Sequence, residues 1–94
     1  LEVQNHGIPE EKVVRTVFKR WSQEYGLKLV ATNDYHYIDP SDAAAQEVKI
    51  CISTGSTLDD PSHFRFYNNE FYMKSGDEMA DLFADMPEAL DTTL

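Results

Sequence analysis

The chain has 94 residues, enough for one small domain, and carries 17 acidic residues against 8 basic ones, for a net charge of −9. A surface that binds nucleic acid nonspecifically must supply cations, so this excess of acidic residues excludes a main role in nucleic-acid binding. The single cysteine, Cys51, excludes an internal disulfide and a multi-cysteine zinc site, and it suits a reducing compartment. No apolar run has the length of a membrane span, so we expect a cytoplasmic location without a membrane partner.

The first seven residues, LEVQNHG, alternate in the manner of a β-strand. Glu2, Gln4 and His6 share one face, which either lies against water or lines a polar site in a barrel or crevice. A chain that begins inside a strand is expected to be an excerpt from something longer.

A helix is predicted from Ile8-Pro9-Glu10-Glu11 to Gly26, because proline and acidic residues favour a first turn and glycine favours a left-handed cap. Four residues of this helix are basic: Lys12, Arg15, Lys19 and Arg20. They form either a solvated face or a phosphate-binding patch, and we expect the solvated face. An apolar face, with Trp21 in the core, is expected to contain Val13, Val14, Val17, Phe18, Trp21 and Tyr25.

A second strand is predicted over Lys28–Asn33, and strand alternation would carry Asp34 and His36 onto one face. A carboxylate and an imidazole that share a face can bind a divalent cation; alternatively, the carboxylate orients a surface histidine. The strand-helix-strand order predicts a right-handed parallel unit, whose strands end on the same edge. His6 would then lie near Asp34 and His36.

A further helix is predicted to begin at Asp39-Pro40 and to end at Gly55, with Cys51 buried as a filler. We expect its packing face to contain Ala43, Ala44, Ala45, Val48, Cys51 and Ile52. The next segment, Thr57 to Pro61, predicts a turn. Its acid pair, Asp59 and Asp60, could bind a metal, but acids before a proline are typical of turns.

The last third combines short elements with many large apolar side chains. A short extended segment is predicted over Glu70–Lys74, and a capping box at Ser75 and Glu78 opens a helix over Glu78–Ala84. A last short helix runs from the Asp85-Met86-Pro87 segment to Leu90. The apolar groups here need a partner surface, either the first strand-helix-strand unit or a part of a longer protein.

Several motifs occur together in one order: LEVQNHGIPE, LVATNDYHYIDPSDA, TGSTLDDP and FYMKSGDEMADLFADMPEAL. In this combination the chain resembles the polymerase-and-histidinol-phosphatase (PHP) domain of the bacterial replicative DNA polymerase III alpha subunits. The resemblance covers essentially the whole chain. It implies an α/β fold: a fragment of a PHP-type (β/α)7 barrel, followed by short helices and a short extended segment. Residues 1–56 would be the C-terminal βαβα portion of that domain, and residues 57–94 would lead towards the polymerase core.

The resemblance implies roles for individual residues. The family's last Asp-x-His metal motif is matched by Asp34 and His36, and His6 is a site-lining residue more clearly than a ligand. Related chains often have Ala-His in the following helix, where this chain has Ala45-Gln46, so no metal role is assigned there. The family's other metal ligands are not among these residues, so the site for zinc, manganese or magnesium is incomplete in this chain.

For the longer protein, the resemblance implies template-directed DNA synthesis on a primer-template with deoxynucleotides, in company with a sliding clamp and other replisome subunits. No catalytic residue of that reaction is expected in this chain, which would be inactive alone and would need the remainder of the alpha subunit. The PHP site could contribute phosphoester hydrolysis or proofreading. The alternative is an acidic interaction module that docks a partner protein through its aromatic C-terminal half.

Overall fold

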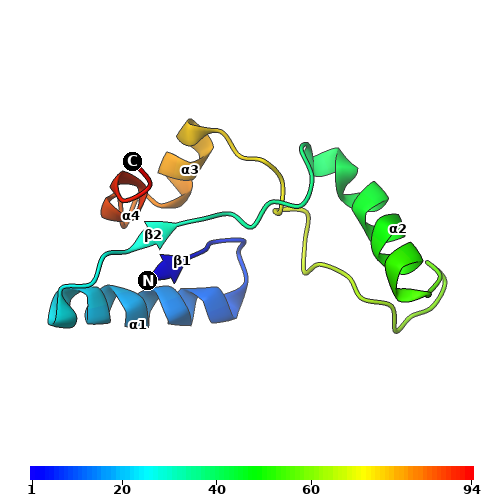
Figure 1. Cartoon of the computed structure of the whole chain (residues 1–94), viewed down its shortest axis with the longest axis horizontal. Coiled ribbons are helices and arrows are strands. Elements are labelled where there is room, and N and C mark those ends of the chain that lie inside the picture. The colour runs from blue at the N-terminus through cyan, green and yellow to red at the C-terminus, as the bar shows by residue number, and fades with distance from the viewer. The chain divides into compact units, whose positions relative to one another are not determined.

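A computed structural model describes residues 1–94, which form two compact units. Unit 1 comprises Leu1–Asp34 and Lys74–Leu94, and unit 2 comprises Tyr35–Met73. Helices are combined with a small parallel sheet, so the expected α/β character is confirmed (Figure 1). None of the helices has both the length and the apolar character needed to cross a membrane.

The sheet of unit 1 has two parallel strands, β1 (Glu2–Val3) and β2 (Val30–Ala31). Val3 pairs with Ala31, and the backbone N–H of Thr32 donates to the carbonyl of Val3 over 3.1 Å. The expected parallel pairing is confirmed. Both strands are shorter than expected, because the sheet has only two strands and each has a single hydrogen-bonded neighbour.

Helix α1 (Pro9–Tyr25) connects the two strands and has the predicted bounds. Pro9 occupies the first turn, and Gly26 ends the helix with a φ of 66°, a conformation that glycine adopts without strain. The predicted packing face is wrong in part. Trp21 is 39% exposed and Val13 is 65% exposed, because the helix turns a narrower stripe around Phe18 towards the core.

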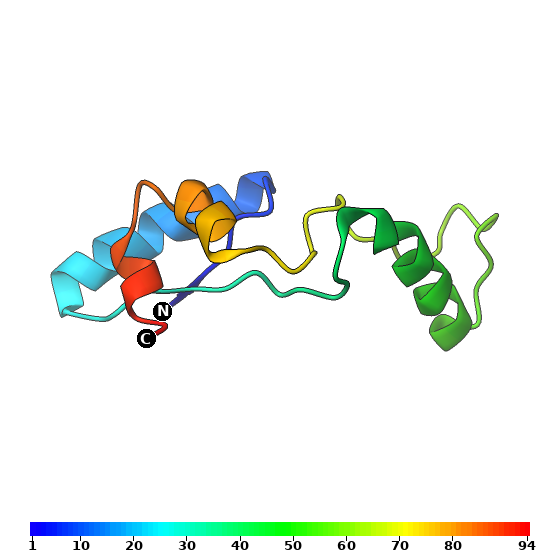
Figure 2. The ribbon, with the colours of Figure 1, turned by 90° about the horizontal axis from the view of Figure 1, so that it is seen from above.

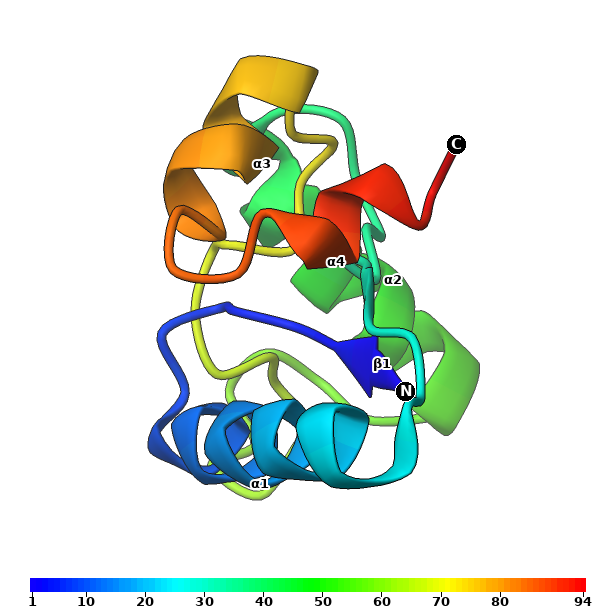
Figure 3. The same cartoon turned by 90° about the vertical axis from the view of Figure 1, so that its left-hand side faces the viewer.

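The core of unit 1 lies between the strands and two short helices near the C-terminus, α3 (Gly76–Leu82) and α4 (Glu88–Asp91). Figures 1 and 3 show α1 on one side of the strands and α3 and α4 on the other. The expectation that apolar groups of the last third pack on the strand-helix-strand unit is therefore confirmed for this core, whose buried members are Val3, Leu29, Ala31, Phe83, Met86 and Ala89.

The predicted capping box opens α3. The backbone N–H of Ser75 donates to Glu78 over 2.8 Å, and the N–H of Glu78 donates to the Ser75 hydroxyl over 3.3 Å. Helix α3 begins at Gly76, two residues before the predicted start at Glu78, because the capping Ser75 lies outside the helix and the first turn of the helix begins directly after this serine. The helix ends at Leu82, two residues before the predicted end at Ala84.

Unit 2 contains a 3-10 turn, η1 (Pro40–Asp42), followed directly by helix α2 (Ala43–Thr54). Asp39 caps this turn and Gly55 ends α2 with a φ of 70°, as the sequence predicts. The predicted face of α2 is wrong in part, since Ala44, Ala45, Val48 and Ile52 are exposed. Cys51 is buried as expected, and the half-buried positions of the helix are Ala43, Gln46, Glu47 and Ile50.

After α2 an irregular segment runs back along unit 2 to Met73 (Figure 2). Tyr72 forms a parallel bridge with Tyr37, and the N–H of Met73 donates to the carbonyl of Tyr37 over 3.0 Å. The extended segment predicted over Glu70–Lys74 thus pairs with the chain that enters the unit.

Candidate functional site

The Asp34-x-His36 pair lies beyond the end of β2 and outside any strand. Strand β2 ends at Ala31, and Asp34 has a left-handed backbone with a φ of 45°. The regular alternation that predicted a shared face therefore does not extend to these positions, because Asp34 interrupts the extended backbone. A carboxylate and an imidazole two residues apart nevertheless have α-carbons within about 7 Å in any backbone conformation.

Both side chains of the pair are exposed to solvent. The ring of His36 packs on Phe66, with centroids 4.8 Å apart, and its backbone N–H donates to the carbonyl of Phe71 over 2.8 Å. These contacts fix the backbone of His36 within unit 2, while Asp34 is the last residue of the first segment of unit 1. The structure brings no third histidine, cysteine or acidic side chain into a group able to hold a metal.

His6, the predicted site-lining residue, is almost fully buried in unit 1, with 1% of its surface exposed. Its Nε2 lies 2.8 Å from the carbonyl oxygen of Asn33, and its Nδ1 lies 2.5 Å from Oε1 of Glu11. Both ring nitrogens therefore face oxygen acceptors of this chain. A metal ion could bind the ring only after one of these hydrogen bonds is broken, so the geometry favours a structural role for His6.

Glu11 receives two hydrogen bonds from His6, one from the ring and one from the backbone N–H over 2.7 Å. Burial raises the pKa of Glu11, but these hydrogen bonds and the charge of His6 outweigh it, and the pKa lies below the usual range of glutamate. The pair connects the start of α1 to the segment that follows β1.

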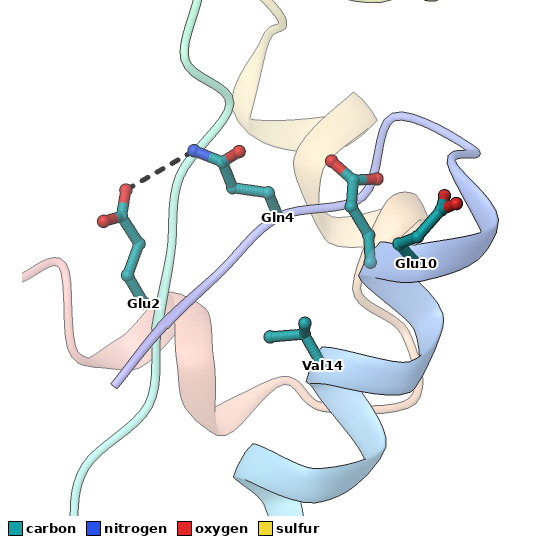
Figure 4. A pocket seen from close by; sticks show the side chains of 5 residues that line it. Glu2, Gln4, Glu10 and Val14 are labelled. Atoms are coloured by element: carbon teal, nitrogen blue, oxygen red, sulfur yellow. Dashed lines mark hydrogen bonds between the residues drawn. The ribbon is translucent and has the colours of Figure 1, made fainter.

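A hollow of about 330 Å³ opens between β1 and the first turns of α1 and is lined by acidic and apolar side chains (Figure 4). Glu2 accepts a hydrogen bond of 2.5 Å from the hydroxyl of Thr32, and the amide of Gln4 donates to the same hydroxyl oxygen over 3.1 Å. Glu2 on β1 and Gln4 directly after it thus bridge to the chain that follows β2. Their contacts give the polar face of the first strand a structural explanation.

Comparison with known proteins gives matches along the whole chain. It is 48% identical to the DNA polymerase III subunit alpha of Helicobacter pylori over 93 residues, which are 99% of this chain and 8% of that protein. It is 49% identical to the subunit of Thermus aquaticus over 95% of this chain and 7% of the relative, and 44% identical to that of Escherichia coli K12 over 100% of this chain and 8% of the relative. No protein-family model matches.

The chain is similar over nearly its whole length to one segment of the bacterial DNA polymerase III alpha subunits. The expected resemblance to these subunits is confirmed. The chain spans less than a tenth of the length of the relatives named here.

Unit 2 contains a buried polar contact that was not predicted from the sequence. His63 is 6% exposed, its Nε2 lies 2.6 Å from Oε1 of Glu47 on α2, and its Nδ1 lies 2.6 Å from the carbonyl oxygen of Asp60. Arg65 reaches the same carboxylate, with Nε 3.6 Å from Oε1. The signal that could have found the contact is the position of Glu47, one helical turn before the buried Cys51.

The acid pair of unit 2, Asp59 and Asp60, supports the interpretation of Thr57 to Pro61 as a turn. The carboxylate of Asp60 accepts hydrogen bonds from the hydroxyl of Ser62 over 2.7 Å and from its N–H over 2.9 Å. These two hydrogen bonds lower the pKa of Asp60. Asp60 thereby stabilises this turn in the way expected of an Asx turn.

Proposed function

We propose that this chain functions as part of a bacterial replicative DNA polymerase III alpha subunit, within its PHP domain. The observation that carries the proposal is the 44–49% identity to named alpha subunits over nearly the whole chain. The reaction of the longer protein is template-directed DNA synthesis, in which a primer 3′-hydroxyl attacks a deoxynucleotide and pyrophosphate leaves. The residues that catalyse this step lie outside these 94 residues, and the isolated chain is inactive.

Exposed apolar side chains support a larger assembly as the setting. Tyr25 on α1 is 64% exposed and Ile52 on α2 is 77% exposed, and Val13 and Phe64 are similarly open to solvent. Large apolar groups gain stability when another surface covers them. In this proposal the remainder of the alpha subunit covers them, in the cytoplasm, and the sliding clamp, primer-template DNA and other replisome subunits associate with the complete protein.

Asp34 and His36 are the residues that would hold a divalent metal in the proposed PHP site. A carboxylate oxygen and an imidazole nitrogen are suitable ligands for zinc or manganese, and both side chains are exposed. Two protein ligands do not complete a catalytic site, so the remaining ligands come from other parts of the alpha subunit. A metal ion bound there would activate water for phosphoester hydrolysis.

The test uses the complete alpha subunit that contains this segment. Asp34→Ala and His36→Ala should each weaken manganese or zinc binding at least about tenfold in calorimetric titrations, with DNA synthesis on a primed template retained. Asp81→Ala, which removes an exposed carboxylate from α3, is the control. Metal binding unaffected by both substitutions would contradict the metal role, and robust turnover by the isolated chain would contradict its assignment as a part.

A second candidate function has one observation in its favour. Unit 2 gathers His36, Phe64, Phe66 and Phe71 into ring contacts, with Phe66 and Phe71 stacked at 4.7 Å, and Phe64 lies exposed at the edge of this group. Such a surface could dock a partner protein on an acidic interaction module. The same titration separates the candidates, because a pure docking module predicts no metal dependence at Asp34 and His36.

A further inference from the structure

Acidic and basic residues of helix α1 line two different hollows. Glu10 and Glu11 line the acidic hollow beside β1, whereas a second hollow of about 340 Å³ lies between α1 and the turn at Asp85 and Met86. Half of the chain's 8 basic residues line this second hollow. We call it the basic groove, and it is lined by Lys12, Arg15, Thr16, Lys19, Arg20, Gln23, Asp85 and Met86.

Two cations of the basic groove are held in place by backbone carbonyls. Arg15 Nη1 donates to the carbonyl oxygen of Gln4 over 2.8 Å, and Lys19 Nζ donates to that of Asp85 over 2.8 Å. Each side chain uses one donor in this way, and a guanidinium has five N–H groups and an ammonium three. Both residues are half-buried and keep further donors for a ligand, while Lys12 and Arg20 are exposed beside them.

The positive charge of the basic groove is not neutralised by ion pairs within the chain. The ion pairs with carboxylates involve His6, His63 and Arg65, and none of the four groove cations takes part. Asp85 is the one acidic residue in the lining, so four cations face one carboxylate. In a chain with a net charge of −9, this is a local concentration of unpaired positive charge.

The spacing of the groove residues matches a linear polyanion better than a compact anion. Lys12, Lys19 and Gln23 recur at helical spacing, and eleven residues at about 1.5 Å per residue span roughly 16 Å along the helix. Phosphates of one nucleic acid strand advance about 3.4 Å each, so this length faces roughly five of them.

We propose that the basic groove of α1 binds the phosphodiester backbone of a nucleic acid strand. The choice of a nucleic acid as the ligand rests on the proposed polymerase function, and the groove would give that function a DNA contact in addition to the residues that catalyse synthesis. Cations on a helix face that meet phosphates without reading base edges give sequence-independent binding.

The negative charge of the chain as a whole limits how this contact works. At physiological ionic strength charges more than about 8 Å apart are largely screened, so the local cations decide binding within the groove. At very low salt the distant carboxylates would repel the strand. The contact is therefore secondary and short-range. This agrees with the acidic composition of the chain, which excludes a main role in nucleic-acid binding.

The test measures binding of a fluorescent single-stranded oligothymidylate of about 12 nucleotides to this chain, at several salt concentrations from about 50 to 200 mM. EDTA is present throughout, so the outcome is independent of the metal proposal. Lys12→Gln with Arg20→Gln removes the two exposed groove cations, which have no partner in the fold. The matched control is Lys28→Gln with Lys49→Gln, which changes the net charge equally outside the groove.

Four phosphate contacts predict that affinity for single-stranded DNA falls about 50-fold over this salt range, and two contacts predict about 7-fold. The groove variant should therefore bind more weakly and with the shallower salt dependence, while the control keeps the salt dependence of the unsubstituted chain. Equal losses in the groove variant and the control would overturn the proposal, as would undetectable binding by the unsubstituted chain. Equal binding of an uncharged methylphosphonate strand would also overturn it, since the ligand would then not be the phosphate charge.

Discussion

The imidazole of His63 joins α2 to the segment that follows it, because its Nε2 lies 2.6 Å from Oε1 of Glu47 while its Nδ1 lies 2.6 Å from the carbonyl oxygen of Asp60. A carbonyl oxygen only accepts, so Nδ1 is the donor there, and Nε2 faces the carboxylate of Glu47. Both nitrogens of the buried ring thus face oxygen atoms of this chain. This arrangement ties the irregular half of unit 2 to its helix.

His63→Ala should destabilise unit 2 by about 1–3 kcal/mol, because it leaves a half-buried carboxylate and a carbonyl without their shared donor. Amide hydrogen exchange on α2 is the suitable measurement, since it reports opening of this unit separately from α1. Exchange on α1, which belongs to unit 1, should not change.

Arg65→Ala is the control for this prediction. Its side chain is 57% exposed and its Nε lies 3.6 Å from Glu47 Oε1, so its loss should cost less than about 1 kcal/mol. If the two variants show equal exchange on α2, the His63 contact does not hold the segment on the helix.

Local signals in the sequence predicted element ends well. The bounds of α1 follow from proline and acids at its start and Gly26 at its end, and the cap of α3 follows from Ser75 and Glu78. These signals act within a turn of the residues they control. The parallel pairing of the strands was likewise predictable, because a helix between two short strands leaves little other choice.

Features that depend on distant chain segments were not predictable in the same way. The contact of His63 with Glu47, which are 16 positions apart in the chain, depends on the path of the irregular segment that follows α2, which no periodicity describes. The burial of α2 also follows that path, so the apolar residues Val48 and Ile52 remain exposed. At the candidate metal pair, Asp34 adopts the left-handed conformation that aspartate tolerates, which strand alternation does not anticipate.

The low pKa of Glu11 predicts a pH dependence of the stability of unit 1. Hydrogen bonds and charge from His6 lower the pKa of the folded carboxyl despite its burial, so the unfolded chain binds a proton more readily than the folded one. The stabilisation is therefore present at neutral pH and is lost as the pH falls through the folded pKa. Glu11→Gln should flatten the decline in unfolding free energy below about pH 5, measured by urea denaturation with Trp21 fluorescence.

Glu10→Gln is the matched control, because Glu10 neighbours Glu11 and is exposed, without a hydrogen bond to His6. This variant changes the net charge equally and should keep the slope of the unsubstituted chain. The same flattening in both variants would mean that the acid sensitivity comes from general charge and not from the pairing with His6.

Tyr37 offers a prediction in the opposite direction, a substitution that preserves or increases stability. Its side chain is buried in unit 2, and its hydroxyl has no hydrogen-bond partner within the chain. Burial is the largest effect and raises the pKa of Tyr37; the backbone of Phe71 lowers it by a smaller amount, and the charge of Glu70 raises it slightly further. A buried hydroxyl without a partner loses its hydrogen bonds to water on folding and gains none in return.

Tyr37→Phe should therefore leave the unfolding free energy unchanged or raise it by up to about 1 kcal/mol, and Tyr67→Phe at an exposed ring should leave it unchanged. Urea denaturation of the three proteins checks this, and a loss of more than about 1 kcal/mol in Tyr37→Phe would show that the hydroxyl is hydrogen-bonded in solution.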